Sequence, residues 1–229
     1  MIKEKIKHFF RHDWLRIIYY NFKYLPLNQA IHLPIDISYK TVIRKCKKIT
    51  INSNKINRSM LSIGFQSSDI FSLKPTIIDN QGSLEINGNN VIIGTGTTIK
   101  IAKNAIVSIA DGTCIGANSL IVCEKSITIQ ENAIFSWNCQ IMDTDTHSLQ
   151  NIVTKEIYQR YKTINIGKNT WIGNHVVINK GTIIPEGTII SSMSLCNKDY
   201  TSLIKPYSVI GGIPAKLITS NRTKINDKL

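Results

Sequence analysis

Two aspartates and a histidine alternate with threonines in the middle of the chain, in the run Asp143-Thr-Asp145-Thr-His147. In an extended segment, residues two apart face the same side, so this spacing predicts that the three polar side chains lie together. A neutral imidazole can take up a proton near pH 7, and a carboxylate on its other ring nitrogen fixes the tautomer and stabilises the imidazolium. The run is therefore suited to activating a hydroxyl group.

Three other interpretations of this run are open at this point. Asp-x-Asp resembles the metal and nucleotide motif of some glycosyltransferases, but such enzymes need an α/β nucleotide domain, which this chain lacks. Asp143, Asp145 and His147 also have ligand types that suit a metal ion, but the sequence offers no further ligand. A solvated polar loop without chemistry is the remaining alternative.

The run opens an insert, 147–163, whose residues are charged and aromatic. Gln150 to Thr163 contains Lys155, Glu156, Tyr158, Arg160 and Tyr161. We expect a loop that leaves the rest of the structure here and returns at Ile164. Tyrosines suit sugar faces, so this loop is interpreted as a lid over an acceptor, with a solvated loop as the alternative.

On both sides of the insert, large apolar residues recur with a period of six, apart from two-residue slips at 99–101, 107–109 and 127–129. The residue four places after each of the anchors named next is small or β-branched. The anchors are Ile93, Ile101, Ile109, Ile115, Ile129, Phe135, Ile166, Ile172, Ile178, Ile184 and Ile190. The period of six excludes a simple amphipathic helix. It predicts a narrow prism of stacked three-strand coils, in which each strand points one large residue inward and Gly or Asn turns the corners.

Before the repeats, residues 2–24 show an apolar face at helical spacing, formed by Ile6, Phe9, Phe10, Trp14, Ile17 and Ile18, opposite Lys and Arg. We expect a basic amphipathic helix that either caps the array or contacts a membrane surface. Short strands are expected from Ile35. The predicted organisation is an N-terminal helical region (1–34), one array (35–218) and a C-terminal tail (219–229).

The net charge of +13 is concentrated at the two ends of the chain. Residues 1–48 carry eleven Lys and Arg against three acidic residues, residues 196–229 carry six against two, and the middle is almost neutral. Such ends favour anionic partners or an anionic membrane face. Five irregularly spaced cysteines indicate free thiols in a reducing compartment. No apolar run is long enough to span a bilayer, and no signal peptide is evident, so a cytoplasmic protein is expected.

These motifs resemble the left-handed parallel β-helix of the hexapeptide-repeat acyltransferases. The resemblance covers roughly residues 77–218 and is most specific in Asp-Thr-Asp-Thr-His-Ser-Leu, in Ile-Gly-Lys-Asn-Thr-Trp-Ile-Gly-Asn-His and in Val-Ile-Gly-Gly-Ile-Pro-Ala-Lys. These runs are similar to the branch that contains galactoside and maltose acetyltransferases and the O-acetyltransferases of capsule and lipopolysaccharide. The left-handed crossovers, which are an exception among proteins, are implied by the family alone.

The resemblance implies a role for each residue of the motifs. His147 would be the catalytic base, with Asp145 or else Asp143 orienting it, and Trp171 would line the acetyl-donor site. Coenzyme A would run along the later coils between subunits of a homotrimer, in contact with Asn174, Ser191, Ser192, Asn197, Lys198 and Lys216. Two departures from the family pattern affect these contacts, because Ser191-Ser192-Met193 replaces Gly-Ala-Gly and the connection 199–205 is long.

From these observations we expect an acetyl-CoA-dependent O-acetyltransferase that acts on a sugar, with no metal requirement and no nucleic-acid partner. The acceptor is expected in a bacterial surface polysaccharide, and the basic helix would allow peripheral contact with the inner membrane. N-acetylation of a nucleotide-linked amino sugar and a non-catalytic β-helix scaffold are the alternatives.

Overall fold

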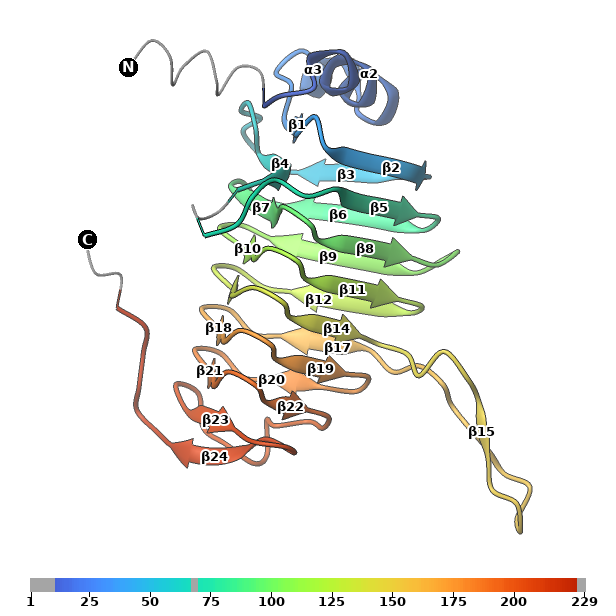
Figure 1. Cartoon of the computed structure of the whole chain (residues 1–229), viewed down its shortest axis with the longest axis vertical. Coiled ribbons are helices and arrows are strands. Elements are labelled where there is room, and N and C mark those ends of the chain that lie inside the picture. The colour runs from blue at the N-terminus through green and yellow to red at the C-terminus, as the bar shows by residue number, and fades with distance from the viewer. Residues whose placement is uncertain (1–10, 67–69, 226–229) are drawn as a thin grey trace.

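The computed structural model describes residues 11–66 and 70–225, and these form a tall three-sided stack. Within them, parallel strands make up three sheets, and each sheet is one face of a prism (Figure 1). Successive strands of the chain go to successive faces, so one coil adds one strand to each sheet. The fold is the expected left-handed parallel β-helix with a short N-terminal helical cap.

The element bounds follow the chain through these faces. The nine-stranded sheet contains β1 (Ile35–Ile37), β4 (Leu61–Phe65), β7 (Val91–Gly94), β10 (Cys114–Ile115), β13 (Ile134–Phe135), β18 (Trp171–Ile172), β21 (Ile189–Ile190), β23 (Val209–Gly211) and β24 (Lys216–Thr219). The seven-stranded sheet contains β2 (Thr41–Cys46), β5 (Thr76–Asn80), β8 (Thr98–Ile101), β11 (Leu120–Cys123), β14 (Gln140–Met142), β19 (Val177–Asn179) and β22 (Leu195–Cys196). The six-stranded sheet contains β3 (Ile49–Asn52), β6 (Ser83–Asn87), β9 (Ile106–Ala110), β12 (Ser126–Ile129), β17 (Ile164–Ile166) and β20 (Ile183–Ile184).

The narrow cross-section of the core sets the six-residue phase of the repeat. Every anchor of the repeat is buried, and the small residues four positions later, such as Thr97 and Cys139, are buried as well. At the corner between the nine-stranded and seven-stranded sheets, Asn118 and Asn138 have φ values of 57° and 58°. Asn tolerates this left-handed conformation better than most residues do. The sequence pattern therefore matches the coils residue by residue.

The first coil is covered by α2 (Trp14–Tyr24) and α3 (Leu27–Ala30), which lie across the top of the stack (Figure 1). Ile17 and Asn21 of α2 are buried. The Asn21 amide donates to the Ile35 carbonyl at 2.7 Å and accepts from the Ile35 N–H at 2.9 Å, so it satisfies the edge of β1. Among the described residues, no helix has the length and apolarity needed to cross a bilayer.

The predicted helix is interrupted just before Trp14. Asp13 accepts from the Arg16 N–H and caps α2, and His12 forms an antiparallel bridge with Ser38, so residues 11–13 are not helical. Ile18, expected on the inner face, is exposed. Ile6, Phe9 and Phe10 of the predicted face lie outside the described residues.

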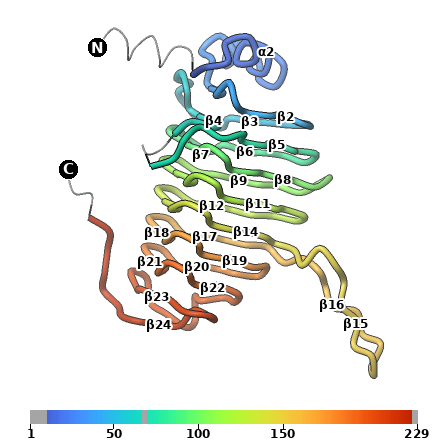
Figure 2. Tube along the Cα trace, in the orientation of Figure 1, coloured from blue at the N-terminus to red at the C-terminus, as the bar shows by residue number. Residues whose placement is uncertain are grey.

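An arm leaves the array after β14 and returns at β17. Its outer part is an antiparallel pair, β15 (Leu149–Gln150) with β16 (Ile157–Tyr158), which projects away from the stack (Figure 2). β17 pairs with β12 of the preceding coil, so the array resumes in register, as expected for Ile164. At the other end, β24 runs antiparallel to β23 and crosses the predicted boundary at residue 218. The division into three regions stays a prediction.

Candidate active site

Asp143 holds the point at which the arm leaves the array. Its side chain is completely buried. The carboxylate accepts the backbone N–H groups of Glu124, Lys125 and Ser126, at 2.7, 2.8 and 2.8 Å, from the corner of the preceding coil. Burial and this neighbouring carboxylate raise the pKa of the Cys123 thiol. Successive N–H groups that converge on one anion form a stable nest, so Asp143 fixes the base of the arm.

The base of the arm is a short antiparallel ladder. The Lys162 N–H donates to the Asp143 carbonyl and the Asp145 N–H donates to the Arg160 carbonyl, both at 2.9 Å. The Asp145 carboxylate forms an ion pair with Lys180, which also donates to the Gln159 carbonyl at 2.8 Å. These contacts hold both strands of the arm against the coil that follows.

His147 is exposed at the start of the free part of the arm. Within the described chain, no hydrogen bond joins its ring to another residue. Thr146, with φ of 63°, turns the backbone between Asp145 and His147. The segment is therefore not continuously extended, and the expectation that Asp143, Asp145 and His147 lie together does not describe this geometry. The assignment of one of these aspartates as the group that orients His147 stays a prediction.

A shallow hollow of about 470 Å³ lies beside His147 on the arm. It is lined by Ser148, Ile157, Tyr158, Gln159, Arg160 and Tyr161. Arg160 is held by Glu124, with 2.9 Å between Nε and Oε2. The arm thus presents a basic and aromatic hollow next to an unengaged imidazole, which is the surface proposed from the sequence as an acceptor lid.

Trp171 lies on a different side of the prism. It begins β18 in the nine-stranded sheet, where it is 39% exposed. The arm leaves from the corner between the seven-stranded and six-stranded sheets, which is opposite the nine-stranded face (Figure 1). One chain therefore does not bring His147 and Trp171 together.

A second group gathers at the corner between the nine-stranded and seven-stranded sheets, which we call the Asn174 corner (Asn174, Ser191, Ser192, Lys216). The Ser192 hydroxyl donates to the Asn174 Oδ1 at 2.5 Å. A Cβ atom at Gly173 would lie 2.6 Å from the Ser192 nitrogen, so this close approach requires glycine. β21 pairs with β23, and Gly211 is opposite Lys216 in β24, which places Lys216 in the same row as Ser191.

The departure at Ser191-Ser192-Met193 has a visible structural effect. Met193 has φ of 61° and an exposed side chain at the corner position where the family pattern has glycine. His175 has φ of 59° in the coil before, and its ring lies 3.2 Å from the Asn138 amide. His175 thus lies at the surface of this corner.

Asn197 and Lys198 are separated from the Asn174 corner. They follow β22, and its register with β19 places them beside Asn179 and Lys180, at the corner from which the arm leaves. We call this the arm corner. The residues predicted to contact coenzyme A are therefore divided between two corners.

The sequence analysis did not identify Lys180 as a site residue. The six-residue phase of the repeat could have indicated it, because this phase aligns Asn179 with Met142 and so places Lys180 close to the aspartates.

The fold is a left-handed β-helix, and its motifs resemble those of the hexapeptide-repeat acetyltransferases. Known proteins with similar sequences and structures agree with this resemblance. No protein-family model matches the chain. Galactoside O-acetyltransferase from Escherichia coli K12 is 30% identical over 138 residues, which are 60% of this chain and 60% of that protein. Polysialic acid O-acetyltransferase from Neisseria meningitidis is 26% identical over 107 residues, which are 43% of this chain and 50% of that protein. The resemblance stated from the motifs is thus confirmed, although the chain spans only half to three fifths of these relatives.

Solved structures show the same fold. The polysialic acid specific acetyltransferase NeuO superposes with a TM-score of 0.52 at 22% identity, over 82% of this chain and 83% of that chain. A mutant of the N-acyltransferase AntD from Bacillus cereus, in complex with dTDP and coenzyme A, gives a TM-score of 0.52 at 21% identity, over 64% of this chain and 78% of that chain. Among the described residues, no group of three or more His, Cys, Asp and Glu is arranged to hold a metal ion.

Proposed function

We propose that this protein is an acetyl-CoA-dependent O-acetyltransferase that modifies a sugar hydroxyl, in a bacterial surface polysaccharide such as capsule or lipopolysaccharide. The observation that carries the proposal is an exposed, unengaged His147 beside the tyrosine-rich hollow, on a scaffold whose sequence relatives are acetyltransferases. Relatives named for galactosides and polysialic acid support a saccharide acceptor.

In the proposed reaction, His147 takes the proton of the acceptor hydroxyl as its oxygen attacks the thioester carbonyl of acetyl-CoA. The tetrahedral intermediate collapses when the carbon–sulfur bond breaks, and the imidazolium returns the proton to the departing thiolate. Hydroxyl and amide donors near Trp171, such as Ser192 and Asn174, would stabilise the oxyanion. Lys216 would bind phosphates of the donor, because an ammonium group complements their charge.

The site is proposed to form between copies of the chain. The Asn174 corner and the arm corner residues Asn197 and Lys198 lie at opposite edges of the seven-stranded sheet, so two neighbouring copies could present both corners to one donor. We propose a homotrimer in which the arm of one copy lies beside Trp171 of the next.

The proposed location is the cytoplasm, with peripheral contact to the inner membrane. Free thiols at all five cysteines fit the cytoplasm, and the exposed side chains of Leu15 and Phe22 on α2 support peripheral membrane contact.

Labelled acetyl-CoA and a panel of capsular and lipopolysaccharide sugars test the proposal. His147→Ala is expected to lower transfer by roughly a hundred- to ten-thousand-fold, the range for loss of a general base. His32→Ala, an exposed histidine on the cap, is the matched control and should keep full activity. Unchanged transfer in His147→Ala would remove the proposed base. Transfer to an amine but to no hydroxyl would establish N-acetylation instead.

A further inference from the structure

A separate pocket of about 550 Å³ lies between α2 and the first coils. Five cations line it, from α2, β2 and the arm corner: Lys23, Arg44, Lys45, Lys47 and Lys103. Tyr19, Tyr20, Tyr24, Ile43, Cys46, Asn80 and Gln81 complete it. None of these described lining residues is acidic, so the pocket concentrates positive charge that its own walls do not neutralise.

The tyrosines form a fixed aromatic wall. The rings of Tyr20 and Tyr24 are stacked, with centroids 5.7 Å apart and planes at 6°. The Tyr24 hydroxyl donates to the Cys46 carbonyl at 2.7 Å, which ties α2 to β2. Lys23 lies 5.1 Å from the centre of the Tyr19 ring and 5.3 Å from that of Tyr24. Flat aromatic rings can pack against a sugar ring, and the ammonium groups beside them can pair with an acidic substituent of that sugar.

The ionisation of these groups keeps the pocket positive at neutral pH. Burial raises the pKa of Tyr24 to about 12, and burial also raises the pKa of Tyr20, so both hydroxyls stay neutral. The hydrogen bond with Tyr19 raises the pKa of Lys23, so its ammonium stays charged.

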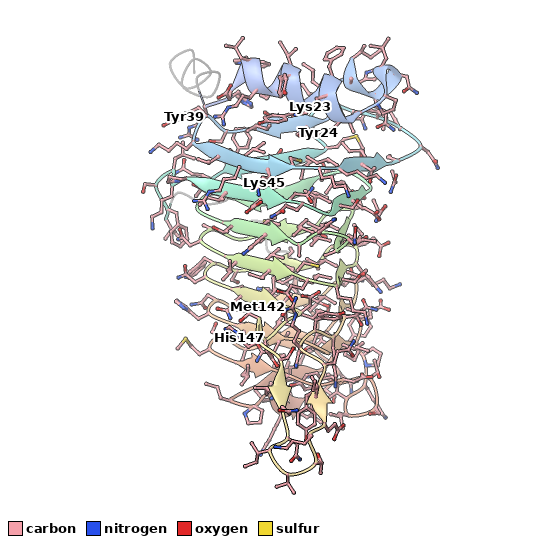
Figure 3. The ribbon with its side chains drawn as sticks, turned by 90° about the vertical axis from the view of Figure 1, so that its right-hand side faces the viewer. Lys23, Tyr24, Tyr39, Lys45, Met142 and His147 are labelled. Atoms are coloured by element: carbon pink, nitrogen blue, oxygen red, sulfur yellow. The ribbon has the colours of Figure 1, made fainter. Side chains whose placement is uncertain are left out.

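The pocket lies on the same side of the molecule as His147. Figure 3 shows Lys23, Tyr24 and Lys45 above Met142 and His147 on one face. β2, β5, β8, β11 and β14 are successive neighbours in the seven-stranded sheet. With about 4.8 Å between adjacent strands, the four steps from β2 to β14 span about 19 Å.

Basic side chains continue along the arm corner between these two points. Lys103 belongs to the pocket, and Lys125, one coil further, lies 5.9 Å from the Tyr161 ring of the arm hollow. The acidic groups of this corner are already engaged, since Glu124 pairs with Arg160 and Asp143 is buried on three N–H groups. Asp79 of β5 is partly buried and lies opposite Lys45 of β2, so a negatively charged chain along this corner would meet Lys103 and Lys125 rather than an exposed carboxylate.

We propose that the α2 pocket is a remote binding subsite for an acidic polysaccharide acceptor, whose chain runs along the arm corner to the hollow beside His147. This inference rests on the proposed function and adds the substrate class: a long sugar chain that carries carboxylate or phosphate groups. The concave, tyrosine-lined shape favours a glycan over a flat lipid surface, which would meet only the outer side of α2.

Binding without acetyl-CoA tests the subsite. The probes are a long oligogalacturonate, the galacturonate disaccharide and neutral dextran, measured by calorimetry at low and high salt. Lys45→Gln with Lys47→Gln should weaken binding of the long acid about tenfold and reduce its salt dependence. Both residues are exposed, so folding should not change, and thermal unfolding checks this. Lys55→Gln with Lys205→Gln is the control with the same charge change elsewhere.

The outcomes separate the subsite from the proposed function. Equal weakening by the pocket pair and the control pair, or equal binding of dextran, would overturn the subsite. The subsite would also be overturned if the protein bound phosphatidylglycerol vesicles but no oligogalacturonate, and if the pocket pair weakened that vesicle binding. Selective loss with the pocket pair supports the subsite, even if no acetyl transfer is found and the proposed function fails. Transfer to long acidic acceptors that the pocket pair does not affect would remove the subsite alone.

Discussion

At the scale of single residues, the alternation of Asp143, Asp145 and His147 has three different outcomes. Asp143 is a structural anion inside the corner, Asp145 pairs with Lys180, and His147 is free at the surface. The residue types alone could predict chemistry in this segment. They could not predict the separation, because the partners of Asp143 are backbone groups of the preceding coil and Thr146 turns the chain.

Asp143→Asn is expected to lower the free energy of unfolding by about 2–3 kcal/mol. Its amide would set an N–H donor against one of the backbone donors that now point at the carboxylate, and that group would be buried without a partner. Urea unfolding measures the change. Asp199→Asn is the control, since the Asp199 carboxylate accepts from Thr201 at an exposed turn. A loss for Asp143→Asn no larger than the control's would contradict this anchoring role.

At the scale of elements, the short coils and the return of the arm at Ile164 could be predicted from the sequence, whereas the start of α2 and the strand pairing within the arm could not. The anchors Ile93 to Ile190 are buried because each coil repeats the same narrow cross-section, so a local pattern carries the fold. The start of α2 depends on His12 meeting Ser38 across the first coil. The inner strands of the arm depend on pairs such as Thr144 with Tyr161. Contacts between residues that are far apart in the sequence produce no periodic pattern from which they could be predicted.

Cys139 tests the phase of the repeat. It occupies an inward position between β13 and β14, and its thiol donates to the Gly173 carbonyl at 3.2 Å. Burial raises its pKa to about 11, so at pH 8 little of it is thiolate. We expect a maleimide to modify Cys139 only when the chain unfolds.

Mass spectrometry of the native protein at increasing times follows each thiol. Cys46 is half-buried and serves as the internal comparison that should react sooner. Labelling of Cys139 at the rate of Cys46 would mean that this coil opens or that the phase is shifted there.

At the scale of the whole molecule, the candidate site is divided by the shape of the prism. His147 projects from one corner and Trp171 lies on the opposite face. The sequence named both residues through motif resemblance, but a linear motif does not say which face of a coil each residue takes. Only the register of the strands shows that one chain places these two residues on different sides of the prism.

Mixed assemblies test this division. His147→Ala and Trp171→Ala chains, co-expressed in equal amounts with different tags, should form trimers in which about a quarter of the sites have both residues intact. Transfer by the mixture should then exceed that of either variant alone. Both substitutions in one chain provide the control, which should stay inactive. A mixture no more active than the mean of its two components would place the whole site within one chain.

The contacts that cover the two ends of the stack bear on whether separate molecules associate edge to edge. A parallel coil leaves a row of unpaired N–H and C=O groups at each end, and such an edge can add another chain without limit. Here Asn21 of α2 occupies the first edge and the antiparallel β24 closes the last nine-stranded edge. These contacts leave the two terminal edges of the nine-stranded sheet less open to the addition of another chain.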